Sequence, residues 1–340
     1  MNAETTAVVK QLLETSKKTV IIGHKNPDGD AIGSCLGLSG FLSLLGHQSQ
    51  VLMPNDFPEF LKWLPGCESI MFHDKEPEKS AKLVAEADII FTLDFNALDR
   101  TGNLQTVLRE ATAPFVMIDH HQQPDPYAVA TYSDVTMSST SQMVYHFIEA
   151  LDGLDHINAP IASALYTGIM TDTGGSFRFT TTPTTHRVVA SLIEKGADNL
   201  SIHQNVYDTN SPDRIKLLGV ALKNLKILPQ YRTAYITISQ KELEDHNFKK
   251  GDTEGFVNYA LSVKGIIFAV IFIESSKDSI VKISFRSKGD FSVNEFAREH
   301  YHGGGHTNAA GGRSHKTMGG TVTEFISILS HYKNALLHVS

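Results

Sequence analysis

The sequence predicts an α/β fold in two domains, with a parallel sheet and flanking helices in the N-terminal domain and a smaller α+β domain after it. Three observations support this prediction. Short apolar runs alternate with helical segments in the first half of the chain, as in βαβ units. Several of these runs end directly at a His or an Asp, as buried parallel strands do at the edge of a sheet. After residue 231 the predicted strands follow one another closely, so the second half has a different architecture.

Each element is assigned from the spacing of its apolar residues and from the turn-forming residues that bound it. In the first half, strands are predicted at residues 19–23, 49–53, 69–72, 88–93 and 115–118, with an edge strand at 127–132. Helices are predicted at residues 1–18, 31–45, 58–64, 78–87, 138–151, 160–170 and 185–196. A helix at 212–228 precedes strands at 233–238, 266–273 and 279–285. We therefore expect a first domain at 1–196, a helical linker at 197–228 and a second domain at 229–340.

Composition narrows the classes of protein and of partner. The 340 residues suffice for two hydrophobic cores, and the 41% of hydrophobic residues excludes general disorder. The formal net charge of -7 does not suit non-specific binding of long duplex nucleic acid. The two cysteines, Cys35 and Cys67, are too few for a disulfide framework, and the N-terminus lacks the apolar core of a signal peptide. We expect a cytoplasmic protein with no membrane segment, because the longest apolar run, 266–273, is too short to cross a bilayer.

Polar residues with metal-binding side chains follow several predicted strands. The central example is the strand at 115–118, which runs directly into Asp119, His120 and His121. The loop at 24–30 supplies His24, Asp28 and Asp30, and the strand at 88–93 ends at Asp94. Taken alone, Asp28 is also compatible with a simple turn and Asp30 with a helix cap. Imidazole and carboxylate groups are ligands that borderline and hard divalent cations favour.

A further carboxylate, Asp172, follows a buried helix and precedes two glycines that permit close backbone packing. With it, four carboxylates and two imidazoles are expected in one cluster: His24, Asp28, Asp30, Asp94, His120 and Asp172. Without cations, four close carboxylates would repel one another and raise their own pKa values. Two divalent cations would neutralise this charge, so we predict a two-metal site.

Candidate substrate contacts lie in two places. Ser138 and Ser139 open a predicted helix, where hydroxyls usually cap the helix and free N–H groups can also receive a phosphate. In the second half, the glycine run at 303–305 precedes His306 and a run compatible with a helix, and Arg286 ends a strand. A glycine run is more often a flexible loop, but next to Arg286 and His306 it favours a phosphate clamp made by Gly304 and Gly305.

The order of these motifs resembles the DHH phosphoesterase superfamily. The matching residues are the run 24–34, then Asp94, then Asp119 with its two histidines, then Asp172. The glycine run with residues 306–311 is similar to the associated substrate-binding domain, DHHA1. The likeness covers nearly the whole chain, and the closest subgroup is the two-domain nanoRNases, which are bifunctional oligoribonucleases and phosphatases of 3′-phosphoadenosine 5′-phosphate.

The resemblance implies two divalent metal ions, Mn²⁺ in this family, and specific roles for the cluster. His24 and Asp28 would hold one ion, Asp94 would bridge, and the remaining three ligands, Asp30, His120 and Asp172, would hold the other. His121 would contact the phosphoryl group, and Asp119 would orient the histidines. The resemblance assigns catalysis to His121, Asp94 and His120. Its expected partners are short single-stranded RNA or small nucleotides, with a homodimer as a further expectation from analogy.

The expected reaction is in-line attack on phosphorus by a hydroxide that two metals activate. One departure from the family pattern concerns residues 95–102, where many members carry a second acid close to the first, and it leaves the role of Arg100 open. Alternatives are a phosphodiesterase of cyclic or linear dinucleotides, a pyrophosphatase, an exonuclease of long strands and a catalytically inactive nucleotide-binding protein. The short segment before residue 19 argues against the first, since its specialised enzymes often carry membrane or sensory segments there.

Overall fold

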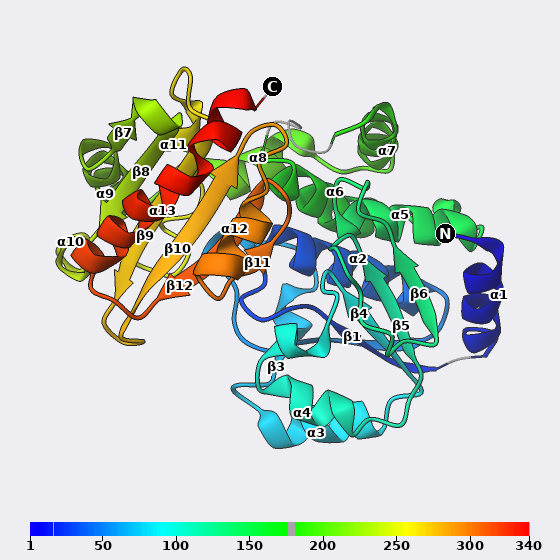
Figure 1. Ribbon diagram of the computed structural model, residues 1–340. Helices are drawn as coiled ribbons and strands as arrows, with labels where there is room; N and C mark the ends of the chain where they lie inside the picture. Colours follow the sequence, from blue (N-terminus) through cyan, green and yellow to red (C-terminus); the bar gives the residue numbers. More distant parts are fainter. Residues whose placement is uncertain (16, 176–180, 340) are drawn as a thin grey trace. The chain divides into compact units, whose positions relative to one another are not determined.

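The computed structural model describes residues 1–15, 17–175 and 181–339, which form two compact units, Met1–Thr209 and Asn210–Ser340 (Figure 1). The predicted fold class is confirmed. The first unit contains a six-stranded parallel sheet, and the second contains a mixed six-stranded sheet.

The parallel sheet of the first unit has the strand order β3-β2-β1-β4-β5-β6. Its strands are β1 (Lys18–Ile22), β2 (Gln48–Met53), β3 (Met71–Phe72), β4 (Ile89–Leu93), β5 (Phe115–Asp119) and β6 (Ala130–Ser133). All residues of β4 and β5 are buried, because these strands lie inside the sheet and are covered on both faces. Their carboxyl ends therefore reach the same edge, where the candidate site lies.

Helices cover both faces of this sheet. They are α1 (Ala3–Leu12), α2 (Gly29–Leu44), α3 (Pro77–Ala85), α4 (Leu104–Arg109), α5 (Thr140–Ala150), α6 (Ala159–Asp172), α7 (Pro183–Glu194) and α8 (Asn199–Tyr207). Alternate strand residues separate the two layers: Ile21 and Phe91 belong to the core that includes α2, α5 and α6. Val20 and Ile90 belong to the core that includes α3 and α4, which Figure 1 shows below the sheet.

Glycines in α2 allow this helix to pack unusually close to α6. A Cβ atom on Gly33 would lie 2.4 Å from the carbonyl oxygen of Ala164, and one on Gly29 would lie 2.3 Å from Oγ1 of Thr171. Neither distance leaves room for a side chain. The small residues therefore bring the first turn of α2, with Asp28 and Asp30 beside it, next to the last turn of α6.

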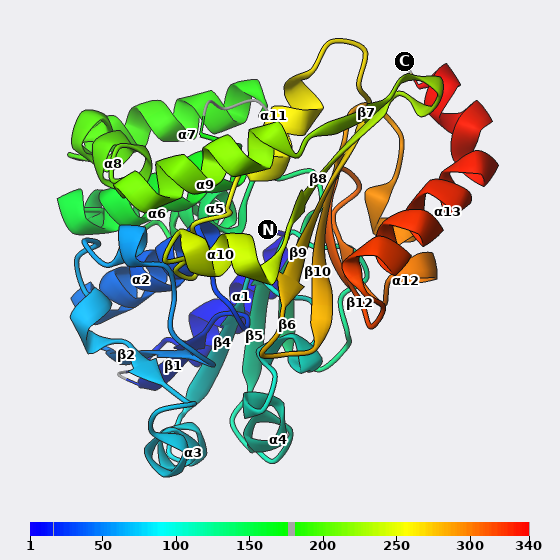
Figure 2. The ribbon, with the colours of Figure 1, turned by 90° about the vertical axis from the view of Figure 1, so that its left-hand side faces the viewer.

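The second unit has the strand order β11-β12-β10-β9-β8-β7. Its strands are β7 (Lys226–Leu228), β8 (Thr233–Ile238), β9 (Phe268–Ser275), β10 (Ile280–Ser287), β11 (Gly304–Gly305) and β12 (Ala309–Ser314). Its helices are α9 (Pro212–Lys223), α10 (Gln240–Asp245), α11 (Phe256–Ser262), α12 (Val293–His300) and α13 (Met318–His338). Figure 2 shows α12 and α13 on one face of this sheet and α9, α10 and α11 on the other. Each layer has its own apolar core.

Several predicted elements differ from the structure. The helix predicted at 58–64 is only the short 3₁₀ helix η1 (Glu59–Leu61), and the strand predicted at 69–72 shortens to β3. The helix predicted at 212–228 ends at Lys223, and its last residues form β7, which pairs with β8. The run after the glycines is the strand β12 rather than a helix, because it pairs along β10. For β7 and β12, long-range strand pairing prevailed over the local helical pattern.

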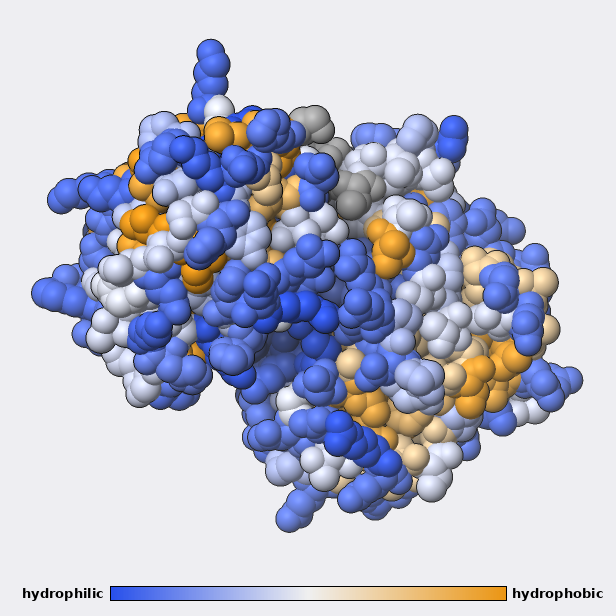
Figure 3. Space-filling view, viewed as in Figure 1, coloured by the Kyte–Doolittle hydropathy of each residue, from blue (hydrophilic) through white to orange (hydrophobic). Residues whose placement is uncertain are grey.

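The surface in Figure 3 is mainly hydrophilic, and its apolar side chains form separate small patches. Within the part of the chain that the structure describes, no helix combines the length and the apolarity needed to cross a membrane.

Candidate metal centre

Three turns at one edge of the parallel sheet bring imidazole and carboxylate groups together. His24, Asp94 and His120 follow the carboxyl ends of β1, β4 and β5, and β4 lies between the other two strands. All three side chains are buried. The parallel register therefore gathers residues that are almost a hundred positions apart in the sequence, as the sequence analysis expected.

The first group consists of His24, Asp28 and Asp94, whose ligand atoms all lie within 4.8 Å of one another. Nε2 of His24 lies 3.5 Å from Oδ2 of Asp94 and 3.9 Å from Oδ1 of Asp28. On the other side of the ring, Nδ1 of His24 lies 2.9 Å from the carbonyl oxygen of Lys25. Since a carbonyl only accepts hydrogen bonds, Nδ1 carries a proton, and Nε2 is the nitrogen that faces the acids and could bind a cation.

The second group consists of Asp30, His120 and Asp172, and its ligand atoms also lie within 4.8 Å of one another. Nε2 of His120 lies 3.7 Å from Oδ2 of Asp172 and 3.9 Å from Oδ2 of Asp30. The backbone N–H groups of Thr140 and Ser141 donate to the two oxygens of Asp30, at 2.6 and 2.8 Å. The N-terminus of α5 thus holds this buried carboxylate with its free N–H groups and its helix dipole.

Asp94 connects the two groups. Its Oδ2 faces His24, while its Oδ1 lies 3.6 Å from Nε2 of His120. The backbone of Asp94 has a φ of 65°, which is in the left-handed region that few residues other than glycine adopt. This unusual backbone conformation directly after β4 is one more sign that the position of Asp94 is strongly determined by its surroundings.

His121 lies beside the second group and has a buried acid behind it. Its Nδ1 lies 2.7 Å from Oδ1 of Asp119 and 3.7 Å from Oδ1 of Asp94. Asp119 has no exposed surface, and its Oδ2 is one of the buried polar atoms of the described residues without a hydrogen-bond partner. The contact with Asp119 holds the His121 ring in one orientation.

The protonation of the cluster reflects its concentration of negative charge. Burial would lower the pKa of His24, but contacts with Asp28 and Asp94 raise it well above the usual value, and Asp94 with the neighbouring acids does the same for His120. Burial and the charges of Asp94 and Asp172 raise the pKa of Asp30 well above the usual value. Burial, together with nearby carboxylates, raises the pKa of Asp172 to about 6. The metal-free cluster thus retains protons that a cation would replace.

The arrangement fits two divalent cations. Each group presents three ligand atoms of the oxygen and imidazole type, close together and with an excess of carboxylates. Four of the six residues are buried, Asp172 is partly buried, and the side chain of Asp28 is half exposed. A single shared carboxylate links the groups, as in sites that hold two metals near each other.

Comparison with known proteins identifies the family. Residues 18–169 match the model of the DHH family, N-terminal domain, and residues 230–334 match the DHHA1 domain. The bifunctional oligoribonuclease and PAP phosphatase NrnA of Thermus thermophilus is 31% identical over 309 residues, which are 89% of this chain and 86% of that protein. The chain belongs to the DHH family of phosphoesterases.

This DHH-family chain is similar to two further proteins over most of its length. The crystal structure of an exopolyphosphatase-related protein from Bacteroides fragilis is similar with a TM-score of 0.95 and 38% identity, covering 99% of this chain and 98% of that one. The cyclic-di-AMP phosphodiesterase GdpP of Geobacillus thermodenitrificans is 26% identical over 92% of this chain, and the chain spans about half of its length, 47%.

The two serines that the sequence suggests as phosphate contacts of this DHH domain lie inside the protein. Ser138 and Ser139 are buried. The hydroxyl of Ser138 donates to Oε1 of Gln142, and the hydroxyl of Ser139 accepts from the backbone N–H of Gln142 as the N-cap of α5. A phosphate contact of these residues stays a prediction, and the structure gives their hydroxyls partners within the fold.

In the DHHA1 unit, the predicted substrate residues gather at one end of the sheet. Arg286 in β10 is opposite Ala309 in β12, and β12 in turn pairs with β11, which consists of Gly304 and Gly305. His306 follows in the turn that joins β11 to β12. The glycine run is therefore a short hairpin, and Oδ1 of Asn294 accepts a hydrogen bond from the N–H of Gly305 at 3.0 Å.

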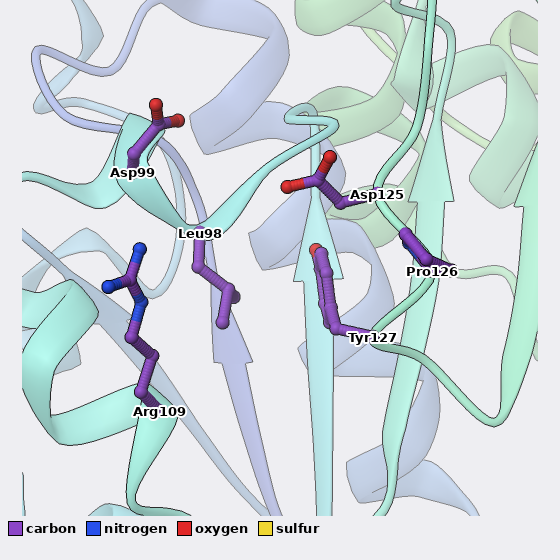
Figure 4. Close-up of a pocket in the computed structure, with 6 residues that line it drawn as sticks. All are labelled: Leu98, Asp99, Arg109, Asp125, Pro126 and Tyr127. Carbon is purple, nitrogen blue, oxygen red and sulfur yellow. The ribbon is translucent and has the colours of Figure 1, made fainter.

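A cavity of about 290 Å³ lies in the DHH domain, next to the loops that follow β4 and β5 (Figure 4). It is lined by Leu98, Asp99, Arg109, Asp125, Pro126 and Tyr127. None of these residues belongs to the cluster of imidazoles and carboxylates, and all of the charged ones are exposed. The candidate centre is therefore the side-chain cluster rather than this cavity.

Helix α5 supplies partners of the cluster that are not among the residues predicted from the sequence. Thr140 and Ser141 follow Ser138 and Ser139 at the start of α5; their N–H groups hold Asp30, and Oγ1 of Thr140 donates to Asp94. Four consecutive hydroxyl residues were the available signal. Their partners lie 110, 111 and 46 positions away in the sequence, so no local pattern identifies them.

Proposed function

We propose that this chain is a metal-dependent phosphoesterase that hydrolyses short oligoribonucleotides to mononucleotides and removes the 3′-phosphate of 3′-phosphoadenosine 5′-phosphate. The observation that carries the proposal is the pair of ligand groups that share Asp94. The similarity to a bifunctional oligoribonuclease and PAP phosphatase over most of both chains supports the choice of substrate.

In this proposal, His24, Asp28 and Asp94 hold one cation, and the acids and imidazole of the second group hold the other, with Asp94 shared. Bound divalent cations, Mn²⁺ by the family resemblance, would lower the pKa of an attacking water and offset charge on the phosphate oxygens. The chain itself contributes the buried, preorganised carboxylates. Because these groups already lie close together, little reorganisation is needed on binding.

His121 is the proposed contact with the phosphoryl group. Its bond to the buried Asp119 fixes the orientation of the ring. A ring that is held in place can contact the phosphoryl oxygens from a fixed position, without reorganisation during the reaction.

Arg286, Gly304, Gly305 and His306 are the proposed contacts with the remote end of the substrate. Support comes from their position at one end of the second unit's sheet, where Arg286 in β10 is opposite Ala309 in β12, which pairs in turn with β11. Such remote contacts would position the scissile phosphate of a short substrate such as a dinucleotide or adenosine bisphosphate.

The decisive experiment measures Mn²⁺-dependent release of mononucleotide from a labelled diribonucleotide. We expect turnover by the wild-type chain, loss of activity on chelation of the metal, and a fall of at least about 10³-fold in His120→Ala. His331→Ala, which removes an exposed imidazole on α13, is the matched control and should keep full activity. Equal turnover by His120→Ala and the wild-type protein would refute the proposal.

A second candidate is hydrolysis of cyclic dinucleotides, which the similarity to a cyclic-di-AMP phosphodiesterase favours. The same assay with a linear dinucleotide, adenosine bisphosphate and cyclic di-AMP ranks the substrates by kcat/KM. A kcat/KM that is highest for the cyclic dinucleotide would replace the first candidate with the second.

A further inference from the structure

Thr140 makes an unusual use of its side chain at the start of α5. Helices usually use a hydroxyl at this end as an N-cap, but here the cap is Ser139, whose side chain accepts from the N–H of Gln142. The hydroxyl of Thr140 is not needed for that purpose. It donates instead to Oδ1 of Asp94 at 3.0 Å, in a fully buried environment.

This hydrogen bond is shorter than every contact between Asp94 and the imidazoles. The imidazole nitrogens of His24, His120 and His121 lie 3.5, 3.6 and 3.7 Å from the oxygens of Asp94. Distances of this size do not fix the rotation of a carboxylate, whereas a hydrogen bond of 3.0 Å does. Thr140 is therefore the group that determines which oxygen of Asp94 faces which ligand group.

The position of Thr140 is itself fixed from two sides. Its backbone N–H donates to Oδ2 of Asp30 at 2.6 Å, so one residue contacts an acid of the second group through its main chain and the shared acid through its side chain. A β-branched side chain has few rotamers on a helix, which limits the movement of the hydroxyl. The distance between Asp30 and Asp94 is thus tied to the rigid start of α5.

A hydroxyl suits this position better than a charged donor. A lysine or arginine would neutralise Asp94 and compete with a cation for it. A neutral O–H donor orients the carboxylate and leaves its negative charge available to metals.

We propose that Thr140 is a positioning residue of the metal centre, which holds Asp94 in the orientation that lets it face both ligand groups. The inference rests on the proposed two-cation function of the site and deepens it. Loss of the hydroxyl should leave Asp94 free to rotate, so that the second cation binds more weakly and turnover falls even at saturating substrate.

The test compares Thr140→Val, which keeps the shape and removes the hydroxyl, with Thr140→Ser, which keeps the hydroxyl. The matched control is Thr167→Val, a buried threonine on α6 whose hydroxyl donates to the carbonyl oxygen of Ser163 at 2.7 Å rather than to an acid. Calorimetric titration of the metal-free proteins with Mn²⁺ gives the affinity without any need for activity. Steady-state kinetics on a diribonucleotide at saturating Mn²⁺ then separates kcat from KM.

We expect Thr140→Val to bind Mn²⁺ about 10- to 100-fold more weakly than the wild type. Its kcat should be lower, whereas its KM should not be raised. Thr140→Ser should stay within about threefold of the wild type, and Thr167→Val should match it. An unchanged Mn²⁺ affinity in Thr140→Val overturns the inference, as does an equal loss in Thr140→Ser or in Thr167→Val.

If Thr140→Val does not fold, Thr140→Ala replaces it in the same comparison. A wild-type chain that binds Mn²⁺ but hydrolyses no nucleotide would refute the proposed function, while the titration would still test Thr140.

Discussion

Oδ1 of Asp119 lies 2.7 Å from Nδ1 of His121, and the acid is completely buried. The other oxygen of Asp119 has no hydrogen-bond partner among the described residues, so the bond to His121 is the hydrogen bond that the structure gives this carboxylate. In such a pair, the acid fixes the tautomer and the orientation of the histidine ring.

This relationship leads us to expect that Asp119→Asn lowers kcat for a diribonucleotide by about 10- to 100-fold, because an amide can present its N–H₂ group to Nδ1 and favour the wrong tautomer. Mn²⁺ affinity should change by less than about threefold, since Asp119 is not a proposed ligand. Asp125→Asn, which changes an exposed acid in the following loop, serves as the control. Parallel losses of kcat and of Mn²⁺ affinity would show that Asp119 acts on the cluster rather than on His121.

Asp172 should affect stability with opposite signs in the absence and presence of metal. Burial, with the carboxylates of Asp28 and Asp94, raises its pKa to about 6 in the metal-free protein. A raised carboxyl pKa means that stability falls as the pH rises from the unfolded value of about 4 to the folded value, and the loss is complete above it. Since one pKa unit is worth about 1.4 kcal/mol, the charged form costs the metal-free fold on the order of 3 kcal/mol.

We therefore expect Asp172→Asn to raise the thermal midpoint above that of the wild type at pH 8 in a chelator. In saturating Mn²⁺ the order should reverse, because the variant loses a ligand and gains less stability from binding. At pH 4 in a chelator the two proteins should differ little, since the acid is then protonated in the folded state. Thermal unfolding followed by circular dichroism checks all three conditions, and a variant that is less stable than the wild type in every one of them would contradict this account.

The positions of the cluster residues could be predicted because they depend on a simple rule. His24, Asp94 and His120 follow strands of one parallel sheet, and parallel strands deliver their carboxyl ends to one edge. The different contacts of Asp28 and Asp30 could not be predicted from the local sequence. Asp28 caps α2 while it faces His24, whereas Asp30 turns toward the start of α5.

Other features depended on contacts between distant segments. The helix predicted at 212–228 fits its apolar spacing, but its end pairs with β8 as the strand β7. The glycine run fits a backbone nest, but Gly304 and Gly305 pair with β12 and form a hairpin. In each case the competing partner lies elsewhere in the sequence, and its register cannot be deduced from composition or periodicity.

The close contact between α2 and α6 should make Gly33 sensitive to the smallest substitution. In Gly33→Ala the new Cβ would lie 2.4 Å from the carbonyl oxygen of Ala164, and neither helix backbone can yield without moving the acids at their ends. We expect a loss of about 1 to 3 kcal/mol in the free energy of unfolding, together with weaker Mn²⁺ binding.

Gly219→Ala is the control for Gly33→Ala, because nothing lies within 4 Å of its Cβ position in α9. That control should gain about 0.4 to 1 kcal/mol. Denaturant unfolding measures both, and a Gly33→Ala protein as stable as the wild type would show that the two helices can separate freely.

Arg286 should affect substrate binding more than the chemical step. Its guanidinium belongs to the end of β10 that neighbours the hairpin of Gly304 and Gly305, in a unit that contains no proposed metal ligand. A remote phosphate contact that is equally strong in the ground state and in the transition state raises KM when it is lost and leaves kcat nearly unchanged. We expect Arg286→Ala to raise KM for adenosine bisphosphate by at least about tenfold, since hydrogen bonds between charged groups are worth about 1.5 to 3 kcal/mol. Arg313→Ala, which removes an exposed guanidinium from β12, should leave KM unchanged. Equal KM values for all three proteins would remove Arg286 from the substrate site, and a fall in kcat at constant KM would assign it to the reaction centre instead.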